Sequence, residues 1–304
     1  MALPGRPMPS SVPRLRDKLL PVASVLALLL LLWYGGAVGL NRAGAVERVL
    51  PTSHPNGDWT IRDLVQVTLN MARPVLPAPH QVAADLYSSL VDWPLDSPRN
   101  LAYHLAVTAQ STLVGFVLGT LLGVVLAAAI VHSRTLDRAL LPWIVASQTV
   151  PVLAIAPIVL VILGSLGFSG LAPKATIAMY LCFFPVTVAM VQGLRAPQRI
   201  ETELLHTYAA SRLQAFWLLR MPSALPYLFP SLRVAIAAGV VGAMVAELPT
   251  GAQAGLGARL LTGSYYGNTV GIWSTLVMSA LLGLGLTLAV AGVERLVLGR
   301  RRAT

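Results

Sequence analysis

The sequence predicts an all-α polytopic membrane protein with six transmembrane helices. Its 304 residues are 56% hydrophobic and only 11% charged, and the mean hydropathy is +0.71. A soluble domain carries about a quarter charged residues, so this chain lacks the polar surface that water requires. Apolar runs of about 18 or more residues recur along it, which is the length that crosses a bilayer as a helix. The net charge of +10 lies in loops and tails beside these runs, so nucleic-acid binding is not expected.

The first predicted transmembrane helix covers residues 19–40 and follows a basic cytoplasmic tail at residues 1–18. A cleaved secretory signal is the alternative, since Ala37-Val-Gly39 has the small residues of a cleavage site. Either outcome leaves residue 41 outside the cytoplasm.

Residues 41–100 are mixed polar and are predicted to form a periplasmic segment. Within them, Leu76-Pro-Ala-Pro79 is a rigid extended stretch, because each proline fixes its own φ angle and restricts the preceding residue. Apolar residues then recur at helical spacing, which predicts a short amphipathic helix at the outer membrane surface. These residues are Val82, Ala83, Leu86, Leu90 and Val91.

A five-helix core is predicted at residues 101–298, ahead of a basic cytoplasmic tail at 299–304. The five helices are predicted at residues 101–131, 140–163, 173–194, 225–248 and 270–298. In the first of them, Gly115, Gly119 and Gly123 are spaced four apart, which lets two helix backbones approach closely in lipid.

Glycines and prolines are expected to affect the packing of one other core helix and the backbone continuity of another. Gly283 and Gly285 are expected to allow the same close packing in the last helix. Pro151 and Pro157 interrupt the backbone hydrogen bonds of the helix at 140–163. A broken helix that lines a substrate site and a simple packing kink are both compatible with these prolines.

The short loops predict the orientation of the chain, because cytoplasmic loops carry an excess of Lys and Arg. The segments 134–138 and 195–220 are basic, whereas 164–173 carries no charge. Both termini are therefore expected in the cytoplasm (N-in, C-in).

The segment of residues 195–222 is polar, helical in pattern and flanked by apolar runs. Pro197 suits the first position of a helix, where a missing N–H costs nothing. Glu201 and Glu203 follow in the early turns, where acids favour the positive end of the helix. A first short helix is therefore predicted here.

A second short helix is predicted to begin after Ser211, because Gln214 follows three residues later in the pattern of a capping box. Pro222 is expected to end it. Such a helix–turn–helix is too structured for a simple connector and predicts a docking element for another protein. Its apolar residues are Leu204, Leu205, Tyr208, Leu213, Phe216, Trp217 and Leu218.

This segment resembles the cytoplasmic loop of permease subunits of binding-protein-dependent ABC importers. That loop has the pattern Glu-Ala-Ala, three residues, Gly, nine residues, Ile-x-Leu-Pro. Here Glu203 and Pro222 match in type and spacing. Leu204 and Leu205 replace the two alanines, and Ala209 stands in place of the turn glycine. Met221 replaces the leucine.

Neighbouring segments resemble the nitrate/sulfonate/taurine branch of these permeases, over about residues 74–298. The matching segments are Leu76–Pro79, Val150–Pro157 with Gly164, Phe183–Val186, and Gly255-Leu-Gly257 after Glu247. The resemblance implies a type I importer architecture with two permease copies, a cytoplasmic ABC ATPase dimer and a periplasmic or lipid-anchored substrate-binding protein. It implies as substrate a small solute such as nitrate, a sulfonate, taurine, bicarbonate or a pyrimidine precursor of thiamine.

The resemblance also assigns residues 195–222 as the loop that couples the permease to its ATPase. The residues it implicates are Glu203, Leu204, Leu205, Tyr208, Ala209, Ser211 and Pro222. This chain carries no P-loop, because its lysines, Lys18 and Lys174, lack the Gly-Lys-Ser/Thr context. ATP and Mg are therefore expected on a separate subunit, with no catalytic residue or cofactor here. His104, His132 and His206 are isolated in the sequence, so no metal site is expected.

A few polar residues within the predicted helices are candidates for a substrate path. Glu247 ends an apolar run and is interpreted either as a gate or path residue or as a solvated acid at the outer interface. Other polar residues either line a cavity or bond between helices. They are Gln148, Thr149, Thr176, Thr187 and Gln192.

Two other functions compete with an importer permease. An autonomous secondary transporter usually places ionisable residues at mid-membrane in two repeated halves, and no internal repeat is found in this sequence. A membrane-embedded enzyme is disfavoured, because the predicted helices hold no HExxH motif, paired carboxylates or Ser/His/Asp set.

Overall fold

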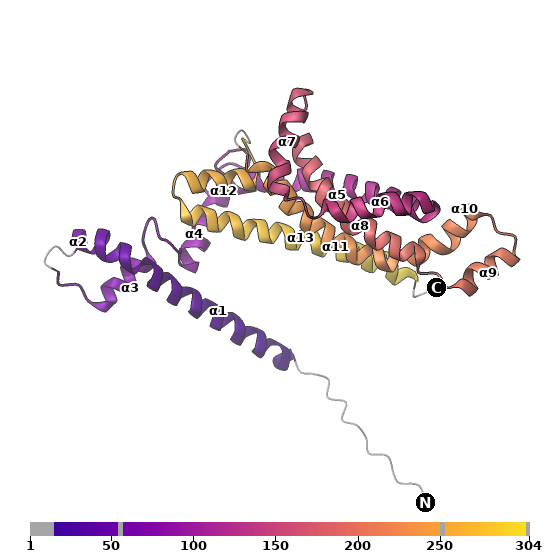
Figure 1. The fold of residues 1–304 in the computed structure, drawn as a ribbon. Helices are drawn as coiled ribbons and strands as arrows, with labels where there is room; N and C mark the ends of the chain where they lie inside the picture. Colours follow the sequence, from indigo (N-terminus) through magenta and orange to yellow (C-terminus); the bar gives the residue numbers. More distant parts are fainter. Residues whose placement is uncertain (1–14, 54–56, 250–252, 302–304) are drawn as a thin grey trace, which may run out of the picture. The chain divides into compact units, whose positions relative to one another are not determined.

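The computed structural model describes residues 15–53, 57–249 and 253–301, and within these ranges it contains helices and no strand. The chain divides into two compact units, Met1–Asp85 and Leu86–Thr304 (Figure 1). In the described residues, five helices are long and apolar enough to cross a membrane, and one bent pair of helices makes a sixth candidate. The all-α membrane fold predicted from the sequence is confirmed, while the number of spans and their orientation stay predictions.

The first unit is built on a long apolar helix and a short helical segment that follows it. Its elements are α1 (Leu15–Gly44), the π-helical turn η1 (Ala45–Val49), α2 (Leu50–Ser53), α3 (Ile61–Leu69) and the first turns of α4 (Pro79–Val91). Helix α1 contains the apolar run predicted at residues 19–40 and continues four residues beyond it.

Asn41, near the end of α1, holds the polar part of this unit together. Its side chain is buried and makes four hydrogen bonds. Nδ2 donates to the carbonyls of Thr68 and Leu76 at 3.1 and 2.9 Å, and Oδ1 accepts from the amides of Val75 and Leu76 at 2.7 and 3.2 Å. One side chain therefore pairs with four backbone groups, at the end of α3 and in the stretch before α4.

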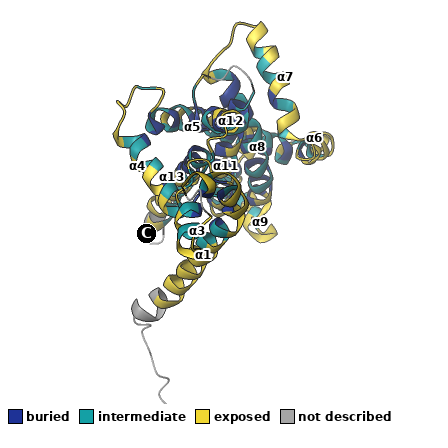
Figure 2. Ribbon diagram, turned by 90° about the vertical axis from the view of Figure 1, so that its left-hand side faces the viewer, coloured by how far each residue is buried: buried dark blue, intermediate teal, exposed yellow. Residues whose placement is uncertain are grey.

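The second unit is a helical bundle centred on α5, α8 and α11. Its elements are α5 (Leu101–His132), α6 (Arg134–Ser147), α7 (Val152–Ser165), α8 (Leu171–Arg195), α9 (Arg199–Thr207), α10 (Arg212–Ala215), the π-helical turn η2 (Phe216–Arg220), α11 (Met221–Glu247), α12 (Leu256–Tyr265) and α13 (Thr269–Arg301). The buried residues gather along α5, α8 and α11, whereas α7 is mostly exposed (Figure 2).

Helix α4 lies where the sequence predicts a short amphipathic helix. Its later residues Leu86 and Leu90 pack against the buried Leu101 and Leu256 of the second unit. Val91 is 59% exposed, so the packed face of the helix is narrower than the apolar pattern indicates. Its position at an outer membrane surface stays a prediction.

The close approach predicted for the glycines of α5 is confirmed, and the partner helix is α8. A Cβ added at Gly119 would lie 2.6 Å from Cβ of Cys182 and 2.8 Å from the carbonyl oxygen of Met179. Gly115 and Gly123 are equally crowded against α8. The three glycines therefore let the two backbones pack without intervening side chains.

The same prediction for Gly283 and Gly285 is not met within this chain, because an added Cβ at either residue meets no described atom within 4 Å. Helix α13 packs on the bundle through its first turns, where Ser274, Met278 and Ser279 are buried. Beyond Ser279 its described side chains are partly or fully exposed.

Gly119→Leu is expected to destabilise the bundle by several kcal/mol, because overpacking alone costs about 1–3 kcal/mol and here the clash is with backbone. Gly285→Leu is the matched control on α13 and should leave the unfolding midpoint nearly unchanged. Thermal unfolding of both variants in the same detergent measures the difference. Equal midpoints for the two variants would contradict the packing of α5 on α8.

Of the two alternatives for the helix predicted at residues 140–163, a packing kink or a break, the structure shows a break. The structure has two helices there, α6 and α7, bent by 103° relative to each other (Figure 1). The break falls at Pro151, which is the N-cap of α7 with an extended backbone. Proline lacks an N–H and disfavours the helical conformation of the residue before it. Pro157 lies inside α7 and does not end it.

Candidate functional site

The polar segment 195–222 joins α8 to α11 through two short helices, α9 and α10. The amide of Gln198 donates to Oε2 of Glu201 at 2.7 Å, and this capping box sets the start of α9 at Arg199. The prediction that Pro197 opens the helix is therefore wrong. Pro197 lies just beyond the end of α8, where a residue that cannot continue a helix is common.

The turn between the two helices is built on Ala209. Helix α9 ends in a Schellman motif, in which the amide of Ala210 donates to the carbonyl of Leu205 at 3.1 Å and that of Ala209 to the carbonyl of His206 at 3.0 Å. Ala209 has φ +53°, in the left-handed region that favours glycine, and no other non-glycine residue of the described ranges has a positive φ. This is the position at which the sequence pattern expects glycine.

Ala209→Gly is expected to stabilise this turn by up to about 1 kcal/mol. The left-handed conformation costs a residue with a Cβ roughly 1–2 kcal/mol, and the greater flexibility of unfolded glycine offsets part of that gain. Hydrogen exchange of the amides of α9 measures the change, with Ala210→Gly as the control at a neighbouring position. Faster exchange in Ala209→Gly than in the unmodified chain would contradict the strained turn.

The second capping box is confirmed. The amide of Ser211 donates to Oε1 of Gln214 at 2.8 Å, and the amide of Gln214 donates to Oγ of Ser211 at 3.3 Å. Helix α10 therefore begins at Arg212.

The prediction that Pro222 ends this helix is wrong. Pro222 lies in the first turn of α11, and α10, η2 and α11 run on without a break from Arg212 to Glu247. In η2 the amide of Met221 donates to the carbonyl of Phe216, five residues back. This wider turn accommodates a proline ring that would clash with an ordinary helix. The second half of the polar segment, from Arg212 onward, is thus continuous with α11.

Two contacts attach the polar segment to the bundle. Phe216 is buried, and its ring lies 5.1 Å from that of His132 at the end of α5. A guanidinium nitrogen of Arg195, at the end of α8, lies 2.9 Å from the carboxylate of Asp137 on α6.

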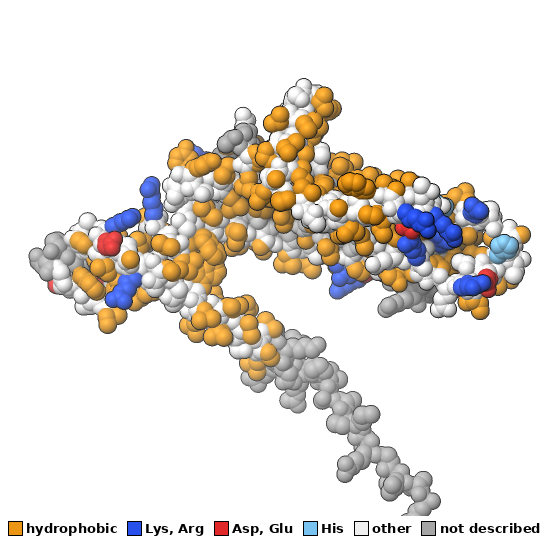
Figure 3. Space-filling view, in the orientation of Figure 1, with side chains coloured by type: hydrophobic (Ala, Val, Ile, Leu, Met, Phe, Trp, Pro, Cys, Tyr) orange, Lys and Arg blue, Asp and Glu red, His pale blue; other side chains and the backbone are white. Residues whose placement is uncertain are grey.

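The outer face of the segment is apolar and exposed. Leu204 is 57% exposed and Tyr208 is 77% exposed, one helical turn apart on α9. We define the exposed apolar face as Ile200, Leu204, Tyr208, Leu213, Trp217 and Leu218. Basic side chains gather around this end of the unit (Figure 3), and exposed arginines there are Arg134, Arg138, Arg195, Arg199 and Arg212. Leu205 is only half-buried, and Glu203 pairs with Arg199 at 2.7 Å.

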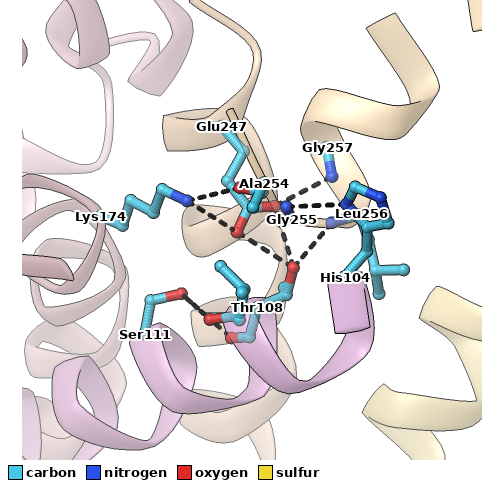
Figure 4. A network of polar contacts seen from close by, with 10 residues as sticks. His104, Thr108, Ser111, Lys174, Glu247, Ala254, Gly255, Leu256 and Gly257 are labelled. Atoms are coloured by element: carbon cyan, nitrogen blue, oxygen red, sulfur yellow. Dashed lines mark hydrogen bonds and ion pairs between the residues drawn. The ribbon is translucent and has the colours of Figure 1, made fainter. Parts of the chain in front are cut away.

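Glu247 lies at the other end of α11 and is fully buried. Oγ1 of Thr108 donates to its carboxylate at 2.9 Å, and the amide of Gly257 donates to Oε2, also at 2.9 Å. Nζ of Lys174 lies 3.6 Å from Oε1 (Figure 4). The interpretation of Glu247 as a solvated acid at an interface is therefore wrong.

The same side chains hold the segment that follows α11. Nζ of Lys174 donates to the carbonyl of Ala254 at 2.6 Å, and Oγ1 of Thr108 accepts from the amide of Leu256 at 2.8 Å. Nδ1 of His104 accepts from the amide of Gly255 at 3.1 Å, so its proton lies on Nε2, which donates to the carbonyl of Pro98. We call Thr108, Lys174, Glu247 and His104, with the amides of residues 255–257, the polar network.

The two glycines at 255 and 257 fit this arrangement. Gly255 has φ +127°, and a side chain there would collide with the carboxylate of Glu247. A Cβ at Gly257 would lie 2.9 Å from Cβ of Glu247. The Gly-Leu-Gly of the sequence pattern is therefore the backbone that approaches the carboxylate.

The four principal candidates for a substrate path are not gathered in one place. Thr187 is buried, and its hydroxyl donates to the carbonyl of Phe183 in its own helix at 2.7 Å. Gln148 and Thr149 lie at the break between α6 and α7, where Thr149 is exposed. Glu247 has its oxygens occupied by the polar network. Their role in transport stays a prediction.

A cavity that the sequence does not indicate lies beside the polar network. Its volume is about 760 Å³, and it is bounded by α5, α7, α8, Ala246 at the end of α11, and the described residues Pro249, Gln253 and Ala254. Its polar lining comes from Tyr103, Gln110, Ser169, Lys174 and Gln253. These residues are far apart in the sequence, so no local motif identifies them.

The chain matches one protein family and several curated proteins. Residues 119–302 match the family described as binding-protein-dependent transport system inner membrane component. The formylaminopyrimidine transport permease protein ThiX of Halalkalibacterium halodurans is 32% identical over 75% of this chain and 86% of its own length.

Two further relatives are similar over nearly the same share of the chain. The riboflavin transport system permease protein RibX of Chloroflexus aurantiacus is 31% identical, over 73% of this chain and 79% of its own length. The taurine transport system permease protein TauC of Escherichia coli is 25% identical, over 78% of this chain and 82% of its own length. The chain is a multi-pass inner-membrane transport permease rather than an enzyme, and it belongs to the family of binding-protein-dependent transport system inner membrane components.

Proposed function

We propose that this chain is the membrane subunit of an ATP-driven importer, and that residues 195–222 couple it to a separate ATPase. ATP and Mg bind to that ATPase, and a substrate-binding protein delivers the solute from outside. The observation that carries this proposal is the exposed apolar face on α9, α10 and η2. It lies at the start of a continuous helical stretch that runs from Arg212 to Glu247.

The exposed apolar face suits a protein partner. An apolar patch ringed by polar and charged residues marks an interaction site, and aromatic residues such as Tyr208 and Trp217 supply much of the binding energy in such sites. The turn residues Ala209 and Ser211 fix the angle between the two helices. The spacing of the importer loop is kept between Glu203 and Pro222, with Leu204 and Leu205 at the positions of its two alanines.

Coupling then follows from the continuous helix. A displacement at α10 moves η2 and α11 together, because no flexible linker lies between them. The anchors at Phe216 and at Arg195 extend the movement to α5, α8 and α6. Rigid-body movement of these helices opens the solute path alternately to the two sides of the membrane.

We further propose that two copies of the chain form the path. Helix α7 stands at 103° to α6, and its apolar side chains are exposed on the single chain, for example Leu153 at 62%. A second copy covers such a surface. The solute is small, and the kinds named for the relatives, a formylaminopyrimidine, riboflavin and taurine, together with sulfonates and nitrate, define the range to test.

The test is co-expression of this chain with an ATPase and a substrate-binding protein encoded beside it. We expect a membrane complex with two copies of this chain and two ATPase subunits, measured by mass photometry after purification. A chain that purifies alone and takes up solute on an ion gradient would contradict the proposal and favour a secondary transporter.

A further inference from the structure

We propose that the cavity beside the polar network binds a neutral, planar, hydrogen-bonding organic solute of the nitrogen-heterocycle class, in preference to a small anion. This inference rests on the proposed transport function and names the class of its substrate. Three observations carry it: the size of the cavity, the ion pair that already occupies Lys174, the one cation among the described lining residues, and the uncharged polar side chains of the lining.

The cavity is much larger than a small ion. At about 30 Å³ for each water in the liquid, a volume of about 760 Å³ corresponds to roughly 25 waters. A nitrate-sized ion would leave most of this space to solvent. Pockets for organic ligands measure about 300–1,000 Å³, and this cavity falls within that range.

The charge of the cavity disfavours an anion. Among its described lining residues, Lys174 is the one cation, and its Nζ is already shared between the carbonyl of Ala254 and the carboxylate of Glu247. An ammonium group paired with a carboxylate adds no net charge to the lining. An anion that drew Lys174 away would leave a buried carboxylate without its counterion, and loss of that partner would weaken anion binding by at least ten-fold.

The remaining polar groups suit a flat neutral ring. The side chains of Gln110 and Ser169 are exposed to the cavity region, and within the described part of the chain the Gln110 side chain makes no hydrogen bond. An amide offers donors and an acceptor together, which match the ring nitrogen and amino group of a heterocycle. Tyr103 and Phe168 add aromatic rings to the lining, and such rings stack on planar ligands.

The experiment measures weak ligand binding directly, by saturation-transfer NMR on the purified chain in lipid nanodiscs. The probes are 4-aminopyrimidine, which is neutral at pH 7.5, benzenesulfonate, which has a ring of the same size and a negative charge, and taurine. We expect saturation transfer to 4-aminopyrimidine at least five-fold above that to the other two probes.

Variants locate the binding in the cavity. Gln110→Leu and Tyr103→Ala are expected to reduce transfer to 4-aminopyrimidine at least five-fold. Gln66→Leu is the matched control, because Gln66 is an exposed glutamine on α3 that does not line the cavity. Unchanged elution from a size-exclusion column shows that the variants remain folded.

Two results would overturn the inference: binding of benzenesulfonate or taurine as strong as that of 4-aminopyrimidine, or unchanged transfer in Gln110→Leu. Failure of the proposed function looks different. If the cavity assignment alone is wrong, the assembled complex still imports solute with ATP while 4-aminopyrimidine does not bind. If the importer assignment is wrong, the probe binds and ATP drives no uptake.

Discussion

Replacing Leu204 and Tyr208 together by aspartate is expected to abolish ATP-driven uptake while the chain still inserts into the membrane. Both side chains are largely exposed, so the bundle should survive the change. In a docked interface each apolar anchor is worth about 2 kcal/mol or more, and an introduced charge adds the cost of its burial. We expect ATPase binding to weaken by roughly 100-fold or more.

The control for this variant is His206→Asp, which places one negative charge on α9, whereas the double variant places two. Position 206 lies on the opposite face of the helix from positions 204 and 208, because two residues turn a helix by about 200°. Pull-down of the ATPase by each variant, at equal membrane abundance, measures the effect. Similar ATPase capture by His206→Asp and by the double variant would show that the exposed apolar face is not the contact.

Removing either partner of the Lys174–Glu247 ion pair is expected to have the second large effect, a loss of stability. We expect Glu247→Gln alone and Lys174→Met alone each to lower the stability of the folded chain by about 3–5 kcal/mol, because each leaves one buried charge without its partner. The double variant should recover most of this loss. A glutamine side chain in place of Glu247 still accepts the hydrogen bonds from Thr108 and Gly257, and the methionine side chain that replaces Lys174 carries no charge.

The measurement is a double-mutant cycle of unfolding midpoints in one detergent. Arg199→Gln provides the control, since the Arg199–Glu203 pair is exposed and is worth a few tenths of a kcal/mol. If the stability losses of the two single variants add up to the loss of the double variant, the pair does not act as a unit. If Glu247→Gln also leaves solute uptake and ATPase coupling unchanged, Glu247 is no gate.

Much of the fold follows from the sequence. A long apolar run can be read from consecutive residues alone, so the positions of the long helices can be predicted without knowledge of their packing. Helices α1, α5, α8 and α13 lie where apolar runs predict them, and the capping box at Ser211 and Gln214 marks the start of α10. The pattern of the polar segment also predicts a turn at Ala209, although the residue found there is not the expected glycine.

Two of the errors arise at prolines, whose effect depends on the surrounding backbone. Pro222 does not end a helix, because a π-helical turn that no sequence signal announces accommodates it. Pro197 precedes α9 rather than opening it, because the capping box of Gln198 and Glu201 sets the start of that helix.

The polar network could not be predicted, because its members are distant in sequence. Thr108 and Glu247 are 139 residues apart, and Lys174 belongs to a third helix. The Gly255-Leu-Gly257 pattern is visible in the sequence, but its reason, the approach of backbone to a buried carboxylate, emerges only when α5, α8 and α11 are packed.

The most direct test of the central claim is solute uptake by proteoliposomes that contain this chain, its ATPase and its substrate-binding protein. We predict uptake that requires ATP on the side of the membrane where the ATPase lies, is unaffected by collapsing ion gradients, and is lost when Leu204 and Tyr208 are replaced by aspartate. Uptake that continues without ATP, or that the double replacement leaves intact, would contradict coupling through residues 195–222.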